Sequence, residues 1–434
     1  MSQHPDQDLD GFFSTARVAG RAEAVELPTD SYTSYRFDLD DPKLAAVRGL
    51  SYEEFSQDRY AAPFLRDLLA YWRSLYDEPF VGLTSDGVPR PGLYALAEPG
   101  RLDPAQHQAA ERLLAALTEG QREAIGYPIT APEWRAWSNP EFVVHRVGLR
   151  LEELESETVA AILDLVRSCL SPQGYERVTE AMALNGFLGE LVDLPLVMNE
   201  RSYWFSLFGR PDSLEPWGWQ LFGHHVAVNF VSVGGRHVIA PVFLGAEPAL
   251  SPERPPLFAE REDLALRLAG SLSAQQRAEA VVYGSVLDPA MPQGRLHPAD
   301  ERHVAGAFRD NRVVPYEGIR ADELTQPQRD LLRALVSDFL QLLLPAQQSA
   351  TLAEYDAHLE ETWFSWYGAS DGSQPFYFRV QSPVIIAELD HHAWVWLGNR
   401  LPARFHVHTT LRHPNGNDYG RALITAWSQR PDQA

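Results

Sequence analysis

The pattern of hydrophobic and polar positions divides the chain into a helical first half and a mixed second half. Over residues 51–125, apolar residues recur at spacings of three and four, as in DPAQHQAAERLLAALTEGQREAI, which is typical of amphipathic helices. The segment SYEEF begins with a serine followed by acidic residues, a common helix start. Residues 138–192 predict a short strand and two or three further helices.

From Tyr203 onward the pattern predicts strands. Four stretches rich in β-branched and aromatic residues are bounded by Gly or Pro, namely YWFSLFGRP, GWQLFGHHVAVNFVSVGGRHVIAPVFLG, PFYFRVQSPVIIAELDHH and RFHVHTTL. Gly234 and Gly235 predict a hairpin turn within the second of them. Three helical segments lie between these strands. We therefore predict an α+β fold, with an antiparallel sheet built mainly from the C-terminal half and flanked by helices, and a helical N-terminal half.

This division suggests three portions. Residues 1–30 are polar and unpatterned, which predicts a flexible N-terminal arm. Residues 31–200 form a mainly helical portion, and residues 201–434 form an α+β portion that carries a histidine-rich site; these two can make one compact unit. We find no internal repeat, and the only notable loop is a proline-rich one around residues 285–320.

Composition and charge exclude several classes of protein. The chain has 434 residues, of which 45% are hydrophobic and 22% charged, as in ordinary globular proteins. A net charge of −22 argues against a nucleic-acid partner, because phosphate binding needs a basic face. The sequence has neither a signal-peptide run at its start nor an apolar window long enough to span a bilayer, so we expect a cytoplasmic protein without a membrane partner. The single cysteine, Cys169, is expected in the core.

The strongest candidate for chemistry is the His-x-His pair in FHVHTTLR. Alternation places His406, His408, Thr410 and Arg412 on one face of a strand, where alternate residues are about 6–7 Å apart. Two imidazoles at that spacing can share one metal ion, although a polar sheet face would have the same pattern. Arg412 can bind a carboxylate or phosphate, or pair with a buried acid.

A second polar face lies in IIAELDHH. There Glu388, Asp390 and His392 alternate with apolar residues, and such carboxylates are metal ligands, general bases, orienters of ligand histidines or simply solvated groups. The connection to the His-x-His strand is short, which predicts an antiparallel pair whose polar faces coincide.

Two further motifs are weaker. In GHHVAVN, interpreted as strand, His224 and His225 point to opposite faces, and we favour His225 as a ligand over His224. The turn RHPNGNDYG is dense in residues that tolerate unusual dihedral angles, and Asp418 and Tyr419 can add a carboxylate and a phenol to the same site.

Several known metal and nucleotide motifs are absent. The His-x-His pair lies near the C-terminus, unlike that of an amidohydrolase barrel, and Arg412 and His413 stand where a cupin would have a glutamate. The sequence contains no His-Glu-x-x-His, Walker loop or Gly-x-Ser-x-Gly motif.

The ordered motifs resemble those of the bacterial and fungal proteins grouped as domain of unknown function 3500. The resemblance extends from Thr84 to Trp427 and includes EWRAWSNPEF, GWQLFGHHVAVNF, YFRVQSPVIIAELD and HVHTTLRHPNGNDYG. It implies that His224, His225, Glu388, His406, His408, Arg412 and residues 415–420 belong to the family's signature. It implies no activity, because none was assigned when the family was defined.

These observations predict a metal-dependent enzyme that acts on a small molecule, with Arg412 favouring a substrate that carries a carboxylate. His225, His406 and His408 are the expected ligands of a divalent transition metal, with Glu388 as fourth ligand or base. Iron, copper and zinc all suit this set. By analogy of site composition we prefer an oxygen-activating non-haem iron or copper oxidoreductase. The alternatives are a zinc-dependent hydrolase and a non-catalytic protein that binds an anionic ligand.

Overall fold

The computed structural model describes residues 31–96, 103–211, 215–292, 294–297, 299–393 and 395–430. The arm predicted for residues 1–30 lies outside these ranges. Among the described residues, no helix is long and apolar enough to cross a membrane.

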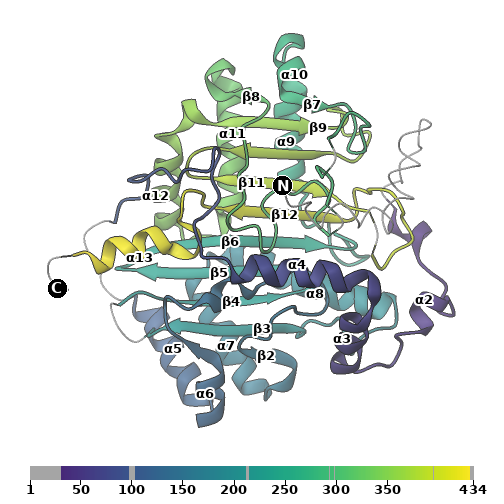
Figure 1. Cartoon of the computed structure of the whole chain (residues 1–434), viewed down its shortest axis with the longest axis vertical. Helices are drawn as coiled ribbons and strands as arrows, with labels where there is room; N and C mark the ends of the chain where they lie inside the picture. The colour runs from purple at the N-terminus through teal and green to yellow at the C-terminus, as the bar shows by residue number, and fades with distance from the viewer. Residues whose placement is uncertain are drawn as a thin grey trace.

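A twelve-stranded sheet forms the centre of the molecule (Figure 1). Its hydrogen-bonded order is β1-β3-β4-β5-β6-β12-β11-β10-β9-β7, with β2 on β3 and β8 on β9. The sheet includes strands from both the 31–200 and the 201–434 portions. The bounds are β1 (Gly126–Tyr127), β2 (Leu149–Arg150), β3 (Tyr203–Gly209), β4 (Trp217–Gly223), β5 (Val226–Val233), β6 (Arg236–Ala246), β7 (Val281–Tyr283), β8 (Ile319–Arg320), β9 (Trp363–Tyr367), β10 (Tyr377–Gln381), β11 (Ile386–His391) and β12 (Val407–Arg412).

The sheet is mixed, so the prediction of an antiparallel sheet was wrong in this respect. β1 pairs with β3 and β7 pairs with β9 in parallel, whereas the long strands pair antiparallel. Both parallel pairs are joined through helices, the kind of connection that a parallel pair requires. The predicted Gly234-Gly235 hairpin between β5 and β6 is confirmed, with Val233 opposite Arg236.

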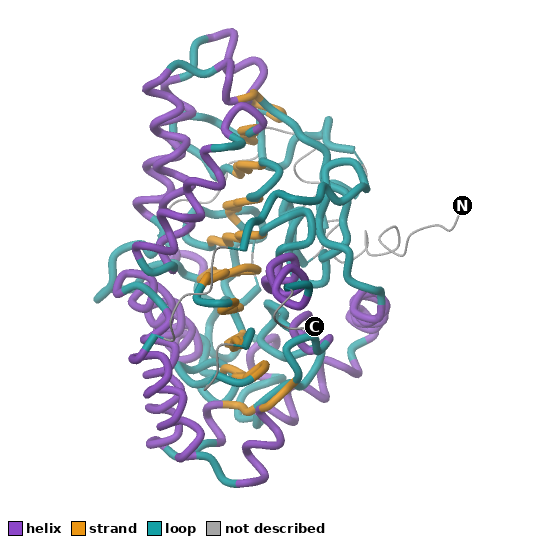
Figure 2. Tube along the Cα trace, turned by 90° about the vertical axis from the view of Figure 1, so that its left-hand side faces the viewer, coloured by secondary structure: helices purple, strands orange, loops and turns teal. Residues whose placement is uncertain are grey.

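Helices cover one face of the sheet, and loops with a few helices cover the other (Figure 2). The bounds are α2 (Pro42–Ala45), α3 (Tyr52–Ala61), α4 (Pro63–Asp77), α5 (Pro104–Ala116), α6 (Glu119–Ile125), α7 (Ser156–Cys169), α8 (Pro172–Leu191), α9 (Ala259–Ser271), α10 (Ala274–Ala280), α11 (Gln326–Phe339), α12 (Pro345–Asp356) and α13 (Arg421–Ser428). Short 3₁₀ turns are η2 (Tyr32–Tyr35), η3 (Pro132–Ala136), η4 (Leu151–Glu153), η5 (Ala321–Glu323), η6 (Leu340–Leu342), η7 (Leu359–Glu361) and η8 (Asp418–Gly420).

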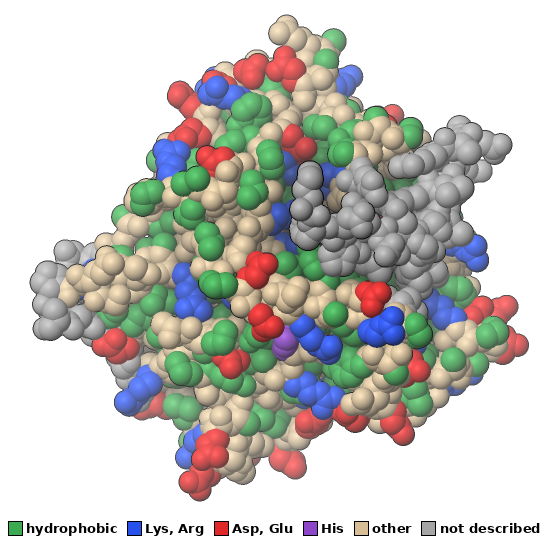
Figure 3. Space-filling model, in the orientation of Figure 1, with side chains coloured by type: hydrophobic (Ala, Val, Ile, Leu, Met, Phe, Trp, Pro, Cys, Tyr) green, Lys and Arg blue, Asp and Glu red, His purple; other side chains and the backbone are tan. Residues whose placement is uncertain are grey.

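Two hydrophobic cores correspond to the two faces. The larger core packs α5, α7, α8, α9 and α11 against one face of the strands, and it includes the buried Cys169. The second core packs α3, α4 and α13 against the opposite face. We call the face of the sheet under the larger core the helix face, and the face under the second core the loop face. In Figure 3, which views the loop face, Lys and Arg side chains are spread among Asp and Glu rather than gathered in one area.

The two halves of the sheet repeat each other, although we found no internal repeat in the sequence. The order of two helices, two short strands, two helices and four long strands runs from α5 to β6 and again from α9 to β12. The short strands bear the related sequences GLR and GIR, and the first long strands read WFSLFG and WFSWYG. The pairing agrees, since Leu149 lies opposite Phe205 as Ile319 lies opposite Phe364. The last strands of the halves, β6 and β12, pair at the centre.

Equivalent glycines support this duplication. Gly148 and Gly318 both have positive φ values, +80° and +88°. A Cβ atom would lie 2.1 Å from the carbonyl oxygen of Phe205 in the first case and of Phe364 in the second. The close approach of the short strand to its neighbour therefore requires glycine in both halves.

We expect Gly148→Ala and Gly318→Ala each to lower the free energy of unfolding by at least about 1–3 kcal/mol, because both strain the backbone and create a clash. Gly120→Ala is the control, since a Cβ there has nothing within 4 Å and lies in helix α6. It should be neutral or stabilising by about 0.5–1 kcal/mol. Denaturant unfolding measures all three, and an unchanged midpoint for Gly148→Ala and Gly318→Ala would contradict the prediction.

Candidate metal centre

The two polar strand faces coincide, as predicted. Val407 and Leu411 of β12 pack in the helix-face core, so His408, Thr410 and Arg412 point to the loop face. On β11, Ala387 and Leu389 likewise pack in the helix-face core. In the antiparallel register Asp390 lies opposite His408 and Glu388 opposite Thr410. Both polar rows therefore lie side by side on the loop face.

His224 and His225 form a turn rather than part of a strand, which corrects the predicted strand. They connect β4 to β5 as a two-residue hairpin loop, with Gly223 opposite Val226. His225 has a φ of +64°, and its ring stacks on that of His224 at a centroid separation of 3.8 Å. The turn geometry, not strand alternation, directs the two rings.

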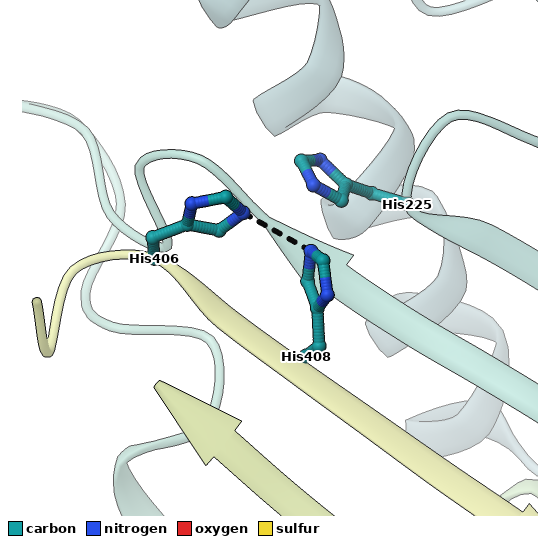
Figure 4. Close-up of side chains that lie close together, drawn as sticks. All are labelled: His225, His406 and His408. Carbon is teal, nitrogen blue, oxygen red and sulfur yellow. Dashed lines mark hydrogen bonds between the residues drawn. The ribbon is translucent and has the colours of Figure 1, made fainter. Parts of the chain in front are cut away.

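The turn brings His225 to the His-x-His pair (Figure 4). Its ring centroid is 5.5 Å from that of His406 and 5.1 Å from that of His408. One nitrogen of each ring lies within 4.8 Å of the others. The Nε2 atoms of His406 and His408 are 3.0 Å apart. Two distant segments of the chain thus present three imidazoles to one point.

Gly245 of β6 makes room for these rings. It lies opposite His408, and its amide donates a hydrogen bond to the carbonyl of His225 at 2.8 Å. A Cβ atom at Gly245 would be 2.7 Å from Cδ2 of His408 and 3.1 Å from Cδ2 of His225. The absence of a side chain therefore lets both rings pack over the strand.

Burial keeps the three imidazoles neutral. All three side chains are buried, and this desolvation lowers the pKa of His406 to about 3. It lowers the pKa of His225 and His408 well below the usual value, with a further contribution from neighbouring histidines. Neutral rings have the free lone pair that metal coordination requires.

His224 has a different environment from His225. Its Nδ1 is 2.9 Å from Oδ1 of Asn185 on α8. Burial lowers its pKa to about 3. It is not among the three residues whose ligand atoms converge. The hydrogen bond to Asn185 gives His224 a role in holding the turn.

Glu388 is engaged by four donors. Its carboxylate accepts hydrogen bonds from the amides of Val304 and Ala305, at 2.9 and 3.0 Å, and from the hydroxyls of Tyr377 and Thr410, at 2.7 and 3.0 Å. Burial alone would raise its pKa, but hydrogen bonding and the charge of His303 outweigh it and lower the pKa to about 2. Glu388 is therefore an ionised anchor for a loop. The structure does not bring it into the His225 group.

The sequence interpretation overlooked His303. This residue lies in the loop before β8, where no periodicity marks it, and its Nδ1 faces Glu388 Oε2 at 3.5 Å and Thr410 Oγ1 at 3.3 Å. Its neighbour Arg302 donates from Nε to Asp390 Oδ1 at 2.6 Å. The proline-rich loop therefore lies over β11 and β12 and supplies further polar groups to the histidine cluster.

Arg412, Asp418 and Tyr419 form a separate buried network. Arg412 donates to Asp418 at 2.8 Å, to Asp310 at 2.5 Å and to the carbonyls of Ala305 and Gly306. The hydroxyl of Tyr419 donates to Asp310 at 3.0 Å. Burial raises the pKa of Asp418 to about 6, although Arg412 opposes this. Their catalytic roles stay predictions, but every nitrogen of the Arg412 guanidinium donates to a protein group.

Four other histidines lie outside this cluster. His391 points to the helix face, where its Nε2 is 3.4 Å from Glu262 of α9. His145 stacks on Tyr76 at 4.0 Å, and His358 contacts Glu361. His237 borders a hollow of about 300 Å³ at the opposite end of β6 from Gly245. That hollow is remote from the histidine cluster.

We expect Arg412→Met to lower the free energy of unfolding by about 3–5 kcal/mol, because it leaves Asp418 buried without its cation and removes one of the two arginines that pair with Asp310, the other being Arg135. Arg66→Met is the matched control, since Arg66 pairs with Asp67 on the exposed surface, and it should change stability by less than about 0.5 kcal/mol. Denaturant unfolding compares the two. Equal effects would show that the Arg412 network is not a stabilising element.

Comparison with known proteins identifies the family to which this chain belongs. A family model described as a protein of unknown function (DUF3500) matches residues 103–421. No curated protein and no solved structure matches the chain. The matched range includes most of the chain and every residue of the histidine cluster, as the resemblance in the sequence predicted. The chain therefore belongs to the DUF3500 family.

Proposed function

We propose that this protein is a metal-dependent enzyme acting on a small molecule, with a transition-metal ion held by His225, His406 and His408. The observation that carries the proposal is the convergence of three buried, neutral imidazoles within 4.8 Å. A buried polar group needs a partner, and a metal ion satisfies three lone pairs at once.

The contact between the His-x-His rings supports a shared ion. Their Nε2 atoms are 3.0 Å apart. Bonds of about 2.0–2.1 Å from one metal to two imidazole nitrogens place those nitrogens about 3 Å apart. A proton shared between the rings is the competing explanation, and metal analysis distinguishes the two.

The neighbouring carboxylates favour the oxidoreductase over the hydrolase. Many zinc hydrolases use a carboxylate as the base that activates water, but Glu388 already accepts four hydrogen bonds and its pKa is lowered to about 2. Asp390 is paired with Arg302. Bound iron or copper would supply oxygen activation without such a base. We therefore keep the preference for an oxygen-activating iron or copper enzyme.

Metal analysis also tests the two alternatives, a zinc-dependent hydrolase and a protein that binds an anionic ligand. Three imidazoles with an open position also form the typical zinc-hydrolase arrangement. The anionic-ligand protein has less support, because Arg412, its expected anion-binding residue, donates to Asp310, Asp418 and two carbonyls. The same contacts remove the basis for preferring a carboxylate-bearing substrate.

Elemental analysis tests the proposal on protein purified without added metal or a polyhistidine tag. We expect near-stoichiometric iron or copper in the wild type, and its loss in His406→Ala/His408→Ala. The control His145→Ala/His358→Ala also loses two histidines, outside the cluster, and should retain the metal. Circular dichroism verifies folding of both variants.

The identity of the metal then selects the assay. Iron or copper directs the search to oxygen consumption with small-molecule substrates, whereas stoichiometric zinc supports the hydrolase. A wild-type protein that contains no metal and takes up none on reconstitution would refute the proposal.

Gly245→Ala tests the geometry without altering a ligand. The added methyl group would contact the rings of His408 and His225 and displace them, so we expect at least a tenfold weaker affinity for the metal in a chelator competition assay. Gly270→Ala, whose Cβ would have only a contact at 3.9 Å, is the control and should bind as the wild type does. Unchanged affinity in Gly245→Ala would mean that the rings do not bind metal in this arrangement.

A further inference from the structure

A second group of potential ligands lies beside the first. It consists of His303 from the loop, Asp390 at the end of β11 and His392 directly after it, and one nitrogen or oxygen of each lies within 4.8 Å of the others. All three side chains are buried. The ring of His392 is 3.8 Å from that of His408, centroid to centroid, and 5.5 Å from that of His406. The two groups therefore share a boundary.

We propose that His303, Asp390 and His392 bind a second metal ion, so that the site is a two-metal centre. The inference rests on the proposed function for the first ion, at His225, His406 and His408. It assigns the second ion to residues that the three-histidine site does not use.

Opposed lone pairs in the second group favour a cation. Nε2 of His392 lies 3.2 Å from Oδ2 of Asp390, but it is buried and makes no hydrogen bond. A ring nitrogen and a carboxylate oxygen at this distance repel each other unless a proton or a metal ion lies between them, and the orientation does not suit a proton.

The surrounding contacts hold these ligands in place. Asp390 accepts the Nε of Arg302 on Oδ1 and the amide of Arg302 on Oδ2, at 2.6 and 3.1 Å, and this leaves Oδ2 a lone pair toward His392. Glu388 faces Nδ1 of His303 and leaves Nε2 as the coordinating atom. A carboxylate behind a ligand histidine is the common arrangement in metal sites.

The other ring nitrogen of His303 has a contact that a metal ion would relieve. Its Nε2 lies 3.2 Å from the carbonyl oxygen of His408. In the neutral tautomer that directs the Nδ1 proton to Glu388, Nε2 would present a lone pair to that oxygen, whereas in the tautomer with the proton on Nε2 this nitrogen donates to it. A protonated His303 would also satisfy the contact. The stoichiometry of metal binding separates these explanations.

A two-metal centre would act on substrate oxygens. Metal ions about 3.5–4 Å apart in enzymes bind both ends of a small oxygen ligand, or an attacking and a leaving oxygen. His408 and His392 lie where such a pair would meet. We therefore expect a small ligand that bridges the ions through oxygen atoms.

Equilibrium dialysis of the metal-free, full-length protein against Co(II) tests the inference. We expect two equivalents for the wild type and one for His392→Ala. The control His391→Gln alters the neighbouring histidine, which points to the helix face, and should bind two. One equivalent in the wild type would overturn the second site while the proposed function stands, and none would overturn both.

A second measurement covers a His392→Ala variant that does not fold. Wild-type protein loaded with Cu(II) should show a much smaller electron paramagnetic resonance signal than its copper content predicts, because adjacent Cu(II) ions couple magnetically. A full-intensity signal from two equivalents of copper would place the ions apart and overturn the two-metal centre.

Discussion

Two buried carboxylates on β11 determine how the centre is assembled. Glu388 and Asp390 are removed from water, which costs several kcal/mol unless donors replace the lost hydration. The loop above supplies those donors through the amides of Val304 and Ala305 and the guanidinium of Arg302. The carboxylates thus hold the loop over the sheet.

His303 stands between two of these anchoring residues, Arg302 and Val304, and is thereby held beside His408. Farther along the loop, the carbonyls of Ala305 and Gly306 and the carboxylate of Asp310 accept hydrogen bonds from Arg412 of β12. The predicted catalytic residues of the C-terminal turn therefore fix the far end of this loop. The satisfaction of buried charge, together with the packing of Val304, Phe308 and Val314 in hydrophobic clusters, specifies the path of the loop.

The centre lies at the seam of a duplicated fold. His225 comes from the β4–β5 turn of the first half, whereas His408 lies on β12 of the second half and His406 directly precedes that strand. The halves meet where β6 pairs with β12, and Gly245 of β6 allows the rings to approach. Neither half alone contains the three imidazoles, so the duplication brings the ligands of one ion together.

The two halves have the same order of elements, but they carry different polar residues at one pair of strands, β4–β5 in the first half and β10–β11 in the second. In the first half Gln220 lies opposite Asn229, and the two amides share a hydrogen bond of 2.7 Å. In the second half Arg379 lies opposite Glu388 at the corresponding place. The amides of the neutral pair also donate to the carbonyls of Trp134 and Pro241, whereas the carboxylate of Glu388 accepts hydrogen bonds from amides of the loop. The presence of a carboxylate at this position explains why the residue that holds the loop, Glu388, lies in the second half.

Local periodicity in the sequence determined most of the elements and the direction of the polar strand residues. Alternation alone placed His408, Thr410 and Arg412 on one face and Glu388 and Asp390 on its neighbour, because successive side chains of a strand point to opposite faces. The family could be identified from the ordered motifs. The parallel edge strands and the duplication escaped notice, because they depend on helical connections and on pairing between distant segments.

Tertiary structure alone decided which of these polar residues meet. The positive φ of His225 turned a predicted strand into a hairpin, and only the pairing of β6 with β12 brought that hairpin to His406 and His408. His303 lies in a loop without periodicity, so its place depends on buried charges that no local pattern reveals. Arg412 was predicted at the right face, but its partners come from two other segments, the loop that carries Ala305 and Asp310 and the turn that carries Asp418. Strand alternation is a property of neighbours in sequence, whereas the satisfaction of buried charge depends on the whole fold.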